Sequence, residues 1–162
     1  MKPGWLGRLV RTWLLIAVVD AIFSSVLVTV FYHSTFARLW QGVASTLLGK
    51  GALDGGARTV VIGLVMHFGV ALFWSLVFLL LYDNSAGIRR AVASRYGVLK
   101  VAAIYGPLIW LVMSLMVIPA LAHRPPTFNF RWLVQLIGHI PFVAVPIVWS
   151  IGRWTARPDA VP

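Results

Sequence analysis

Four long apolar stretches limit the structures that this chain can form. They cover residues 10–32, 59–82, 101–122 and 132–151. Each holds about 20 residues or more, enough for a helix rising ~1.5 Å per residue to cross a hydrocarbon layer of ~30 Å. Lipid offers no hydrogen-bond partners, so a chain that crosses it must pair its backbone polar groups in a helix or a closed barrel. These stretches lack the alternation of apolar and polar residues that barrel strands show. The sequence therefore predicts an all-α integral membrane four-helix bundle, with residues 1–162 as a single transmembrane domain.

The composition agrees with a lipid environment. Apolar residues make up 60% of the chain and charged residues 11%, against roughly 45–50% and 25% in soluble domains. The net charge of +10 does not indicate a nucleic-acid partner, because the basic residues lie in short segments between the apolar stretches, where lipid headgroups attract them. The absence of cysteine excludes disulfides, iron–sulfur clusters and thiolate metal sites.

The lysines and arginines predict an orientation. The larger group lies before the first stretch, between the second and third, and after the fourth: Lys2, Arg8, Arg11, Arg89, Arg90, Arg95, Lys100, Arg153 and Arg157. The smaller group lies in the other two connections: Arg38, Lys50, Arg58, Arg124 and Arg131. By the positive-inside rule, the larger group and both termini are cytoplasmic. We expect a multi-pass protein of the cell inner (plasma) membrane.

The first outer loop, residues 33–58, contains a further helical pattern. Apolar residues recur at three- and four-residue spacing: Phe36, Leu39, Trp40, Val43, Leu47 and Leu48. This spacing predicts a short interfacial helix, with Trp40 as its anchor among the lipid headgroups.

Ionisable residues inside the apolar stretches are the candidate site. Asp20 lies near the middle of the first stretch, where an ionised carboxylate costs about 2.5–3.5 kcal/mol. His67, His139 and Ser114 lie about 10–12 Å below the outer ends of their stretches, and Asp20 about 18 Å below. Gln135 is on the same helical face as His139. The sequence thus predicts a polar intramembrane cluster of Asp20, His67, His139, Ser114 and Gln135.

Three interpretations of this cluster stay open. The side chains can serve only as buried hydrogen-bonding groups that hold helices together. They can form a proton or small-solute site, in which Asp20 exchanges protons with a histidine. His67 and His139, on facing helices at similar depth, can also be weak candidates for metal binding or the axial ligands of a haem. No metal site beyond these two histidines is expected.

Several short segments are similar to a known group of membrane proteins. They are His67 followed by Trp74, the loop Arg124-Pro125-Pro126-Thr127-Phe128, Gly138-His139, and the segment 39–45. Together they resemble the YagU-like family of small, uncharacterised four-helix bacterial inner-membrane proteins. The resemblance implies no assigned biochemical activity and an association with acid tolerance, and its motif carries over to His67 and Gly138-His139.

No pattern in the sequence indicates an enzyme. We expect a protein without catalytic activity that serves as a structural protein or an accessory subunit of a membrane assembly. One alternative is proton-linked transport or an acid response that uses Asp20, His67 and His139, and another is a haem-binding electron carrier. The expected partners are the lipid bilayer and either other membrane subunits or further copies of the chain.

Overall fold

The computed structural model describes residues 4–155, with side chains as far as Arg153. This part of the chain is all-α and contains no strand. Lys2 and Arg157, which count toward the predicted orientation, lie outside the described residues. In chain order the elements are α1 (Trp5–Val26), the π-helical turn η1 (Leu27–Phe31), α2 (Phe36–Leu48), the 3-10 turn η2 (Lys50–Asp54), α3 (Gly56–Asn84), α4 (Ala86–Ala93), α5 (Gly97–Val112), the π-helical turn η3 (Met113–Val117), α6 (Ile118–Ala122), α7 (Phe130–His139), the π-helical turn η4 (Ile140–Ala144) and α8 (Val145–Thr155).

Four continuous helices are long and apolar enough to cross a membrane. They run over Trp5–Phe31, Gly56–Asn84, Gly97–Ala122 and Phe130–Arg153. The prediction of four long apolar helices is confirmed. Each helix starts a few residues before the apolar stretch, because hydropathy does not mark the residue at which backbone hydrogen bonding begins.

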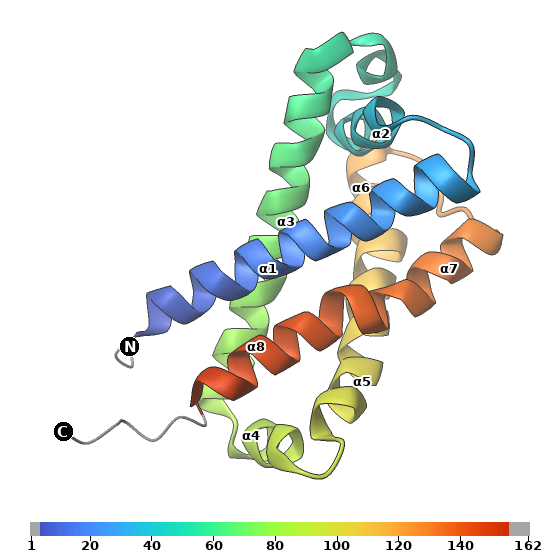
Figure 1. Cartoon of the computed structure of the whole chain (residues 1–162). Helices are drawn as coiled ribbons and strands as arrows, with labels where there is room; N and C mark the ends of the chain where they lie inside the picture. The colour runs from blue at the N-terminus through green and yellow to red at the C-terminus, as the bar shows by residue number, and fades with distance from the viewer. Residues whose placement is uncertain (1–3, 156–162) are drawn as a thin grey trace.

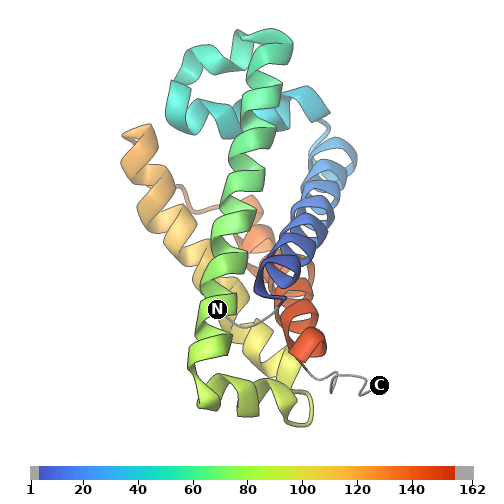
Figure 2. The same ribbon diagram turned by 90° about the vertical axis from the view of Figure 1, so that its left-hand side faces the viewer.

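Contacts between neighbouring helices join the four long helices into one bundle. α1 packs along α8 and also against α3, and α5 packs against α7, η4 and α8. α3 and α5–α6 run in opposite directions (Figure 1). Both ends of the described chain lie at the same end of the molecule as α4. α3 and α5–α6 diverge toward the opposite end, where α2 lies across the top (Figure 2). α2 contacts α3 most extensively and also reaches α6 and α1.

α2 forms where a helix is predicted, but its tryptophan has a different environment. The helix begins at Thr35, whose hydroxyl accepts a hydrogen bond from the Arg38 backbone amide at 3.1 Å. Trp40 is only 1% exposed, so its prediction as a headgroup anchor is wrong. The cause lies in α3, where Gly63 has no side chain and lets the Trp40 backbone approach closely. Trp40 therefore packs into the molecule, and its ring lies 5.0 Å from that of His67.

Proline accounts for two of the wide π-helical turns. Pro119 is the second residue of α6, after η3; Pro141 lies within η4, and Pro146 is the second residue of α8. A proline has no amide hydrogen and leaves an earlier carbonyl without its usual donor. A local change to a wider turn gives such carbonyls other partners. These turns rotate the side chains that follow them, which affects the candidate site.

A buried ion pair joins α1 to the end of α3. Both terminal nitrogens of Arg8 donate to the Asp83 carboxylate, at 3.1 and 2.9 Å, and the two side chains are 9% and 12% exposed. By contrast, the ion pair of Arg38 and Asp54 spans 3.9 Å, with side chains 53% and 90% exposed. The Arg8–Asp83 pair is thus held tightly inside the described structure, whereas the Arg38–Asp54 pair is exposed.

We expect Gly63→Ala to destabilise the protein and Gly69→Ala not to. Both glycines lie in α3, and alanine in place of glycine favours a helix by about 1 kcal/mol. A methyl group on Gly63 would overlap the Trp40 carbonyl oxygen, whereas one on Gly69 would meet no atom within 4 Å. Thermal unfolding in detergent should show a loss of about 1–3 kcal/mol for Gly63→Ala. Equal stability of the two variants would contradict the close approach of α2 and α3.

The two ion pairs should respond differently to the loss of their carboxylates. Asp83→Ala leaves a buried guanidinium unpaired, and we expect it to lower the free energy of unfolding by about 3–5 kcal/mol. Asp54→Ala should cost about 0–1 kcal/mol, because its pair is exposed. The double variant Arg8→Met/Asp83→Leu should recover much of the loss, since it removes both charges. A double variant less stable than Asp83→Ala would argue against the pair.

Candidate functional site

α1 presents a buried polar face toward the other helices. Arg8, Thr12, Ile16, Asp20 and Ser24 recur every four residues and so lie along one side of the helix. The Thr12 hydroxyl shares a hydrogen bond of 2.8 Å with the Ser150 hydroxyl of α8, and the Ser24 hydroxyl points to the Asp20 carboxylate at 3.5 Å. Only Ile16 interrupts this face, and it is 1% exposed.

His67 links α3 to this face of α1. Its Nε2 atom lies 2.9 Å from the Ala17 carbonyl oxygen, and its Nδ1 atom lies 3.8 Å from the Asp20 carboxylate. A carbonyl oxygen only accepts, so Nε2 must carry a hydrogen. In a neutral ring, Nδ1 would then present a lone pair to a carboxylate, and the two would repel. One extra proton, on Nδ1 or on the carboxyl group, turns this repulsion into attraction.

His139, the last residue of α7, approaches the same region. Its Nδ1 atom lies 2.7 Å from the Gln135 carbonyl oxygen, so Nδ1 carries a hydrogen and Nε2 is the nitrogen that can accept one. The Trp110 ring lies 4.9 Å from the imidazole. Gly106 makes this position possible, because a side chain there would come within 2.8 Å of the His139 carbonyl oxygen.

Asp20, His67 and His139 line one cavity of about 160 Å³. α3 forms one wall with Val70 and Trp74, and α5 and η3 form the other with Trp110 and Met113. α2 covers the cavity through Val43. An engineered cavity of about 150 Å³ accepts a benzene-sized molecule. The site can therefore hold several waters or one small solute beside Asp20, His67 and His139. His139 is close enough to Asp20 and His67 for their charges to affect it.

Two predicted members of the cluster do not line the cavity. Ser114 is buried, and its hydroxyl has no hydrogen-bond partner among the described residues. It lies one turn after Trp110, inside the wider π-helical turn η3, and it is not among the residues that line the cavity. Gln135 contributes its backbone carbonyl to His139, and its side chain is not part of the lining. The prediction that all five side chains meet is wrong for these two.

A haem does not fit this arrangement. Axial ligation takes one ring nitrogen from each histidine, but His67 Nε2 is bonded to Ala17 and its Nδ1 faces Asp20. The cavity of about 160 Å³ is also below the roughly 300–1,000 Å³ of pockets that hold drug-sized ligands. Among residues 4–155, no three metal-ligating side chains gather into a metal site.

The aromatic rings around the histidines are functional neighbours that the sequence reasoning missed. Trp40 and Phe68 pack against His67, at 5.0 and 5.8 Å, and Trp110 packs against His139. These rings limit the access of solvent to the imidazoles. The glycines at the helix crossings were the available signal, since Gly63 lies against the Trp40 backbone and Gly106 against the His139 backbone.

We expect His139, in its neutral state, to carry its hydrogen on Nδ1. Free imidazoles and exposed histidines mostly carry it on Nε2, so exposed His33 and His123 serve as internal controls. The ¹⁵N resonances of histidine-labelled protein, assigned by a His139→Gln variant, distinguish the two tautomers. A neutral His139 with its hydrogen on Nε2 would contradict the bond to the Gln135 carbonyl.

No protein-family model matches the chain, and neither the search of curated proteins nor that of solved structures gives a match. The resemblance to the YagU-like family therefore stays a prediction.

Proposed function

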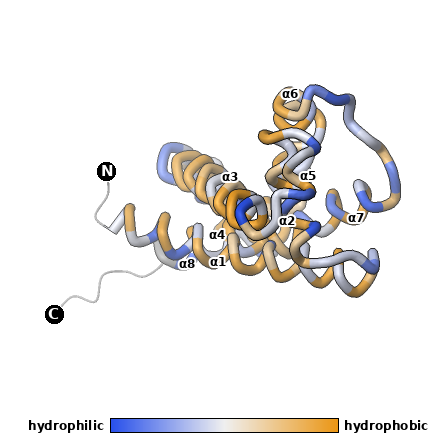
Figure 3. Tube along the Cα trace, turned by 90° about the horizontal axis from the view of Figure 1, so that it is seen from above, coloured by the Kyte–Doolittle hydropathy of each residue, from blue (hydrophilic) through white to orange (hydrophobic). Residues whose placement is uncertain are grey.

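We propose that the chain is a multi-pass protein of the bacterial inner membrane, with both termini in the cytoplasm. The outward faces of the long helices support this, since large apolar side chains such as Ile104 and Val65 are 74% and 66% exposed. Seen from above, the tube is apolar along much of its long helices, and polar segments lie mainly in the connections (Figure 3). A surface of this kind promotes aggregation in water but is favourable among lipid tails.

The function that the geometry supports best is proton-linked transport across that membrane. The observation that carries it is the orientation of His67, whose Nδ1 faces Asp20 while Nε2 is held by the Ala17 carbonyl. One proton held by this pair would remove the repulsion between the Nδ1 lone pair and the carboxylate, and the pair lines a cavity that has room for water or a small solute. His139 supplies a second proton acceptor in the same cavity, as a relay would need.

The polar face of α1 supplies a route toward the cytoplasmic end. Thr12 and Ser150 lie between the cavity and the ion pair of Arg8 with Asp83. Ile16 lies one helical turn from Asp20 and one from Thr12, and separates the two polar regions. The arrangement thus corresponds to a state closed toward the cytoplasm, and transport requires Ile16 to move aside.

We expect Asp20→Asn to slow proton transport strongly while the protein stays folded. The amide of asparagine can donate a hydrogen bond to Nδ1 of neutral His67, so the contact survives without a transferable proton. In vesicles carrying a pH-sensitive dye, the wild-type protein should dissipate an imposed pH gradient faster than empty vesicles do. Asp20→Asn should slow this by about 100-fold, the scale of a lost proton-transfer group.

Asp54→Asn is the matched control, since it makes the same chemical change at an exposed carboxylate, and it should retain the wild-type rate. Wild-type protein that is folded in the vesicles but no faster than empty vesicles would contradict the transport proposal. That result would favour the accessory-subunit hypothesis, in which the chain acts only with a partner.

A further inference from the structure

A second cavity lies at the cytoplasmic end of the proposed topology, between α4 and the ends of α3, α5 and α8. It has a volume of about 520 Å³ and no part in the proton site. We call it the basic groove, defined by the lining residues Tyr82, Arg89, Arg90, Val92, Trp149 and Arg153.

Three arginines, Arg89, Arg90 and Arg153, line this groove, and each guanidinium group has contacts at one side. One terminal nitrogen of Arg89 donates to the carbonyls of Tyr82 and Asp83, at 3.0 and 2.9 Å, and so ties the side chain to the end of α3. Nε of Arg90 donates to the Ala86 carbonyl at 3.3 Å. The Arg153 guanidinium lies 4.8 Å from the centre of the Trp149 ring. Each guanidinium keeps further N–H groups for a ligand.

No carboxylate balances this charge within the described part of the chain. The groove lining contains no acidic residue, and the carboxylate of the nearby Asp83 is bound to Arg8. Fixed arginines without an acidic partner favour a phosphate or carboxylate group, which accepts paired hydrogen bonds from a guanidinium.

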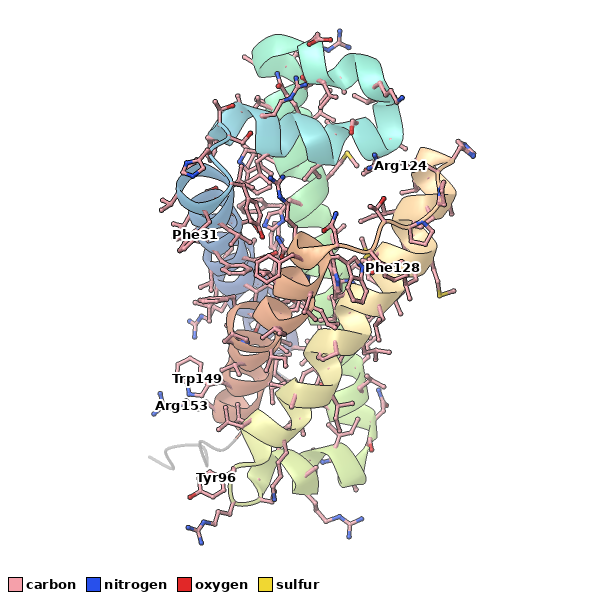
Figure 4. The ribbon with its side chains drawn as sticks, turned by 90° about the vertical axis from the view of Figure 1, so that its right-hand side faces the viewer. Phe31, Tyr96, Arg124, Phe128, Trp149 and Arg153 are labelled. Atoms are coloured by element: carbon pink, nitrogen blue, oxygen red, sulfur yellow. The ribbon has the colours of Figure 1, made fainter. Side chains whose placement is uncertain are left out.

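The rest of the groove is apolar. Val92 and Val98 form part of its lining, and Trp149 is 43% exposed. Trp149 and Arg153 lie together on the outer side of α8, near the end of the molecule that carries Tyr96 (Figure 4). A ligand that satisfies both parts has an anionic head beside an apolar body, as a phospholipid has.

We propose that the basic groove binds the phosphodiester headgroup of an anionic phospholipid. The inference rests on the proposed insertion in the membrane, which brings this end of the molecule to the level of the cytoplasmic-leaflet headgroups. Arg89 is fixed by the α3 carbonyls and orients the headgroup, Arg90 and Arg153 neutralise it, and Trp149 lies along the glycerol and upper acyl chain.

The test compares two double variants that remove the same charge. Arg90→Gln/Arg153→Gln changes the groove but spares the α3 contacts of Arg89. Arg95→Gln/Lys100→Gln changes two exposed residues at the same end, outside the groove lining, and Arg95 also has a ring partner, Tyr96 at 5.0 Å. Native mass spectrometry of the full chain in detergent, titrated with phosphatidylglycerol, measures bound lipid.

We expect the groove variant to lose about thirtyfold in apparent affinity for phosphatidylglycerol, or about fivefold for each arginine. The control variant should stay within about threefold of wild type, because it leaves the groove intact and weakens only the long-range attraction between this end of the protein and an anionic lipid. Equal losses in the two variants, or no loss in either, would overturn the proposed site. Displacement of the lipid by an equal concentration of inorganic phosphate would also overturn it, because the apolar part of the groove would then be irrelevant.

Flotation with pure phosphatidylcholine vesicles separates this inference from the proposal on which it rests. Wild-type protein that fails to float with these neutral vesicles would overturn both. Protein that floats, but shows no preference for phosphatidylglycerol in the titration, would overturn only the lipid site.

Discussion

The hydrogen bond between His67 and the Ala17 carbonyl is the interaction on which the candidate site depends. It decides which ring nitrogen faces Asp20, and a carbonyl can only accept, so the remaining nitrogen has no hydrogen to offer in a neutral ring. The Asp20 carboxylate lies 3.8 Å from that nitrogen, and one more proton on either group would remove the repulsion between them. The proton-linked function that we propose follows from this single constraint, together with the presence of a cavity beside the pair.

The helices hold this geometry because glycines let their backbones approach. Gly63 admits the backbone of α2 and so brings Trp40 against His67, while Gly106 admits the backbone of η4 and α7 and so places His139. Small residues at helix crossings are the usual means of packing when no hydrophobic force acts between helices in lipid. Beside the cavity, the Tyr105 hydroxyl of α5 donates to the Trp74 carbonyl of α3 at 2.8 Å and joins these two helices.

Much of the fold was predictable from the sequence, because the length of an apolar stretch is a local property. The four long helices and α2 lie where hydropathy and residue spacing predict them. His67 and His139, which the sequence places at similar depth, line one cavity. The absence of Ser114 from the cavity lining was not predictable, since regular helical spacing does not locate a π-helical turn such as η3. Neither the burial of Trp40 nor the pairing of Arg8 with Asp83 could be foreseen, because both arise from contacts between distant segments. The orientation in the membrane and the transport function remain proposals.

The most direct test of the account is the protonation state of the Asp20–His67 pair. Solid-state NMR of the protein in lipid at neutral pH, with ¹⁵N-labelled histidine and ¹³C-labelled aspartate, reports both groups in one sample. The account predicts one proton beyond the Nε2 hydrogen, either on Nδ1 of His67 or on the Asp20 carboxyl group. A neutral imidazole beside an ionised carboxylate would contradict it.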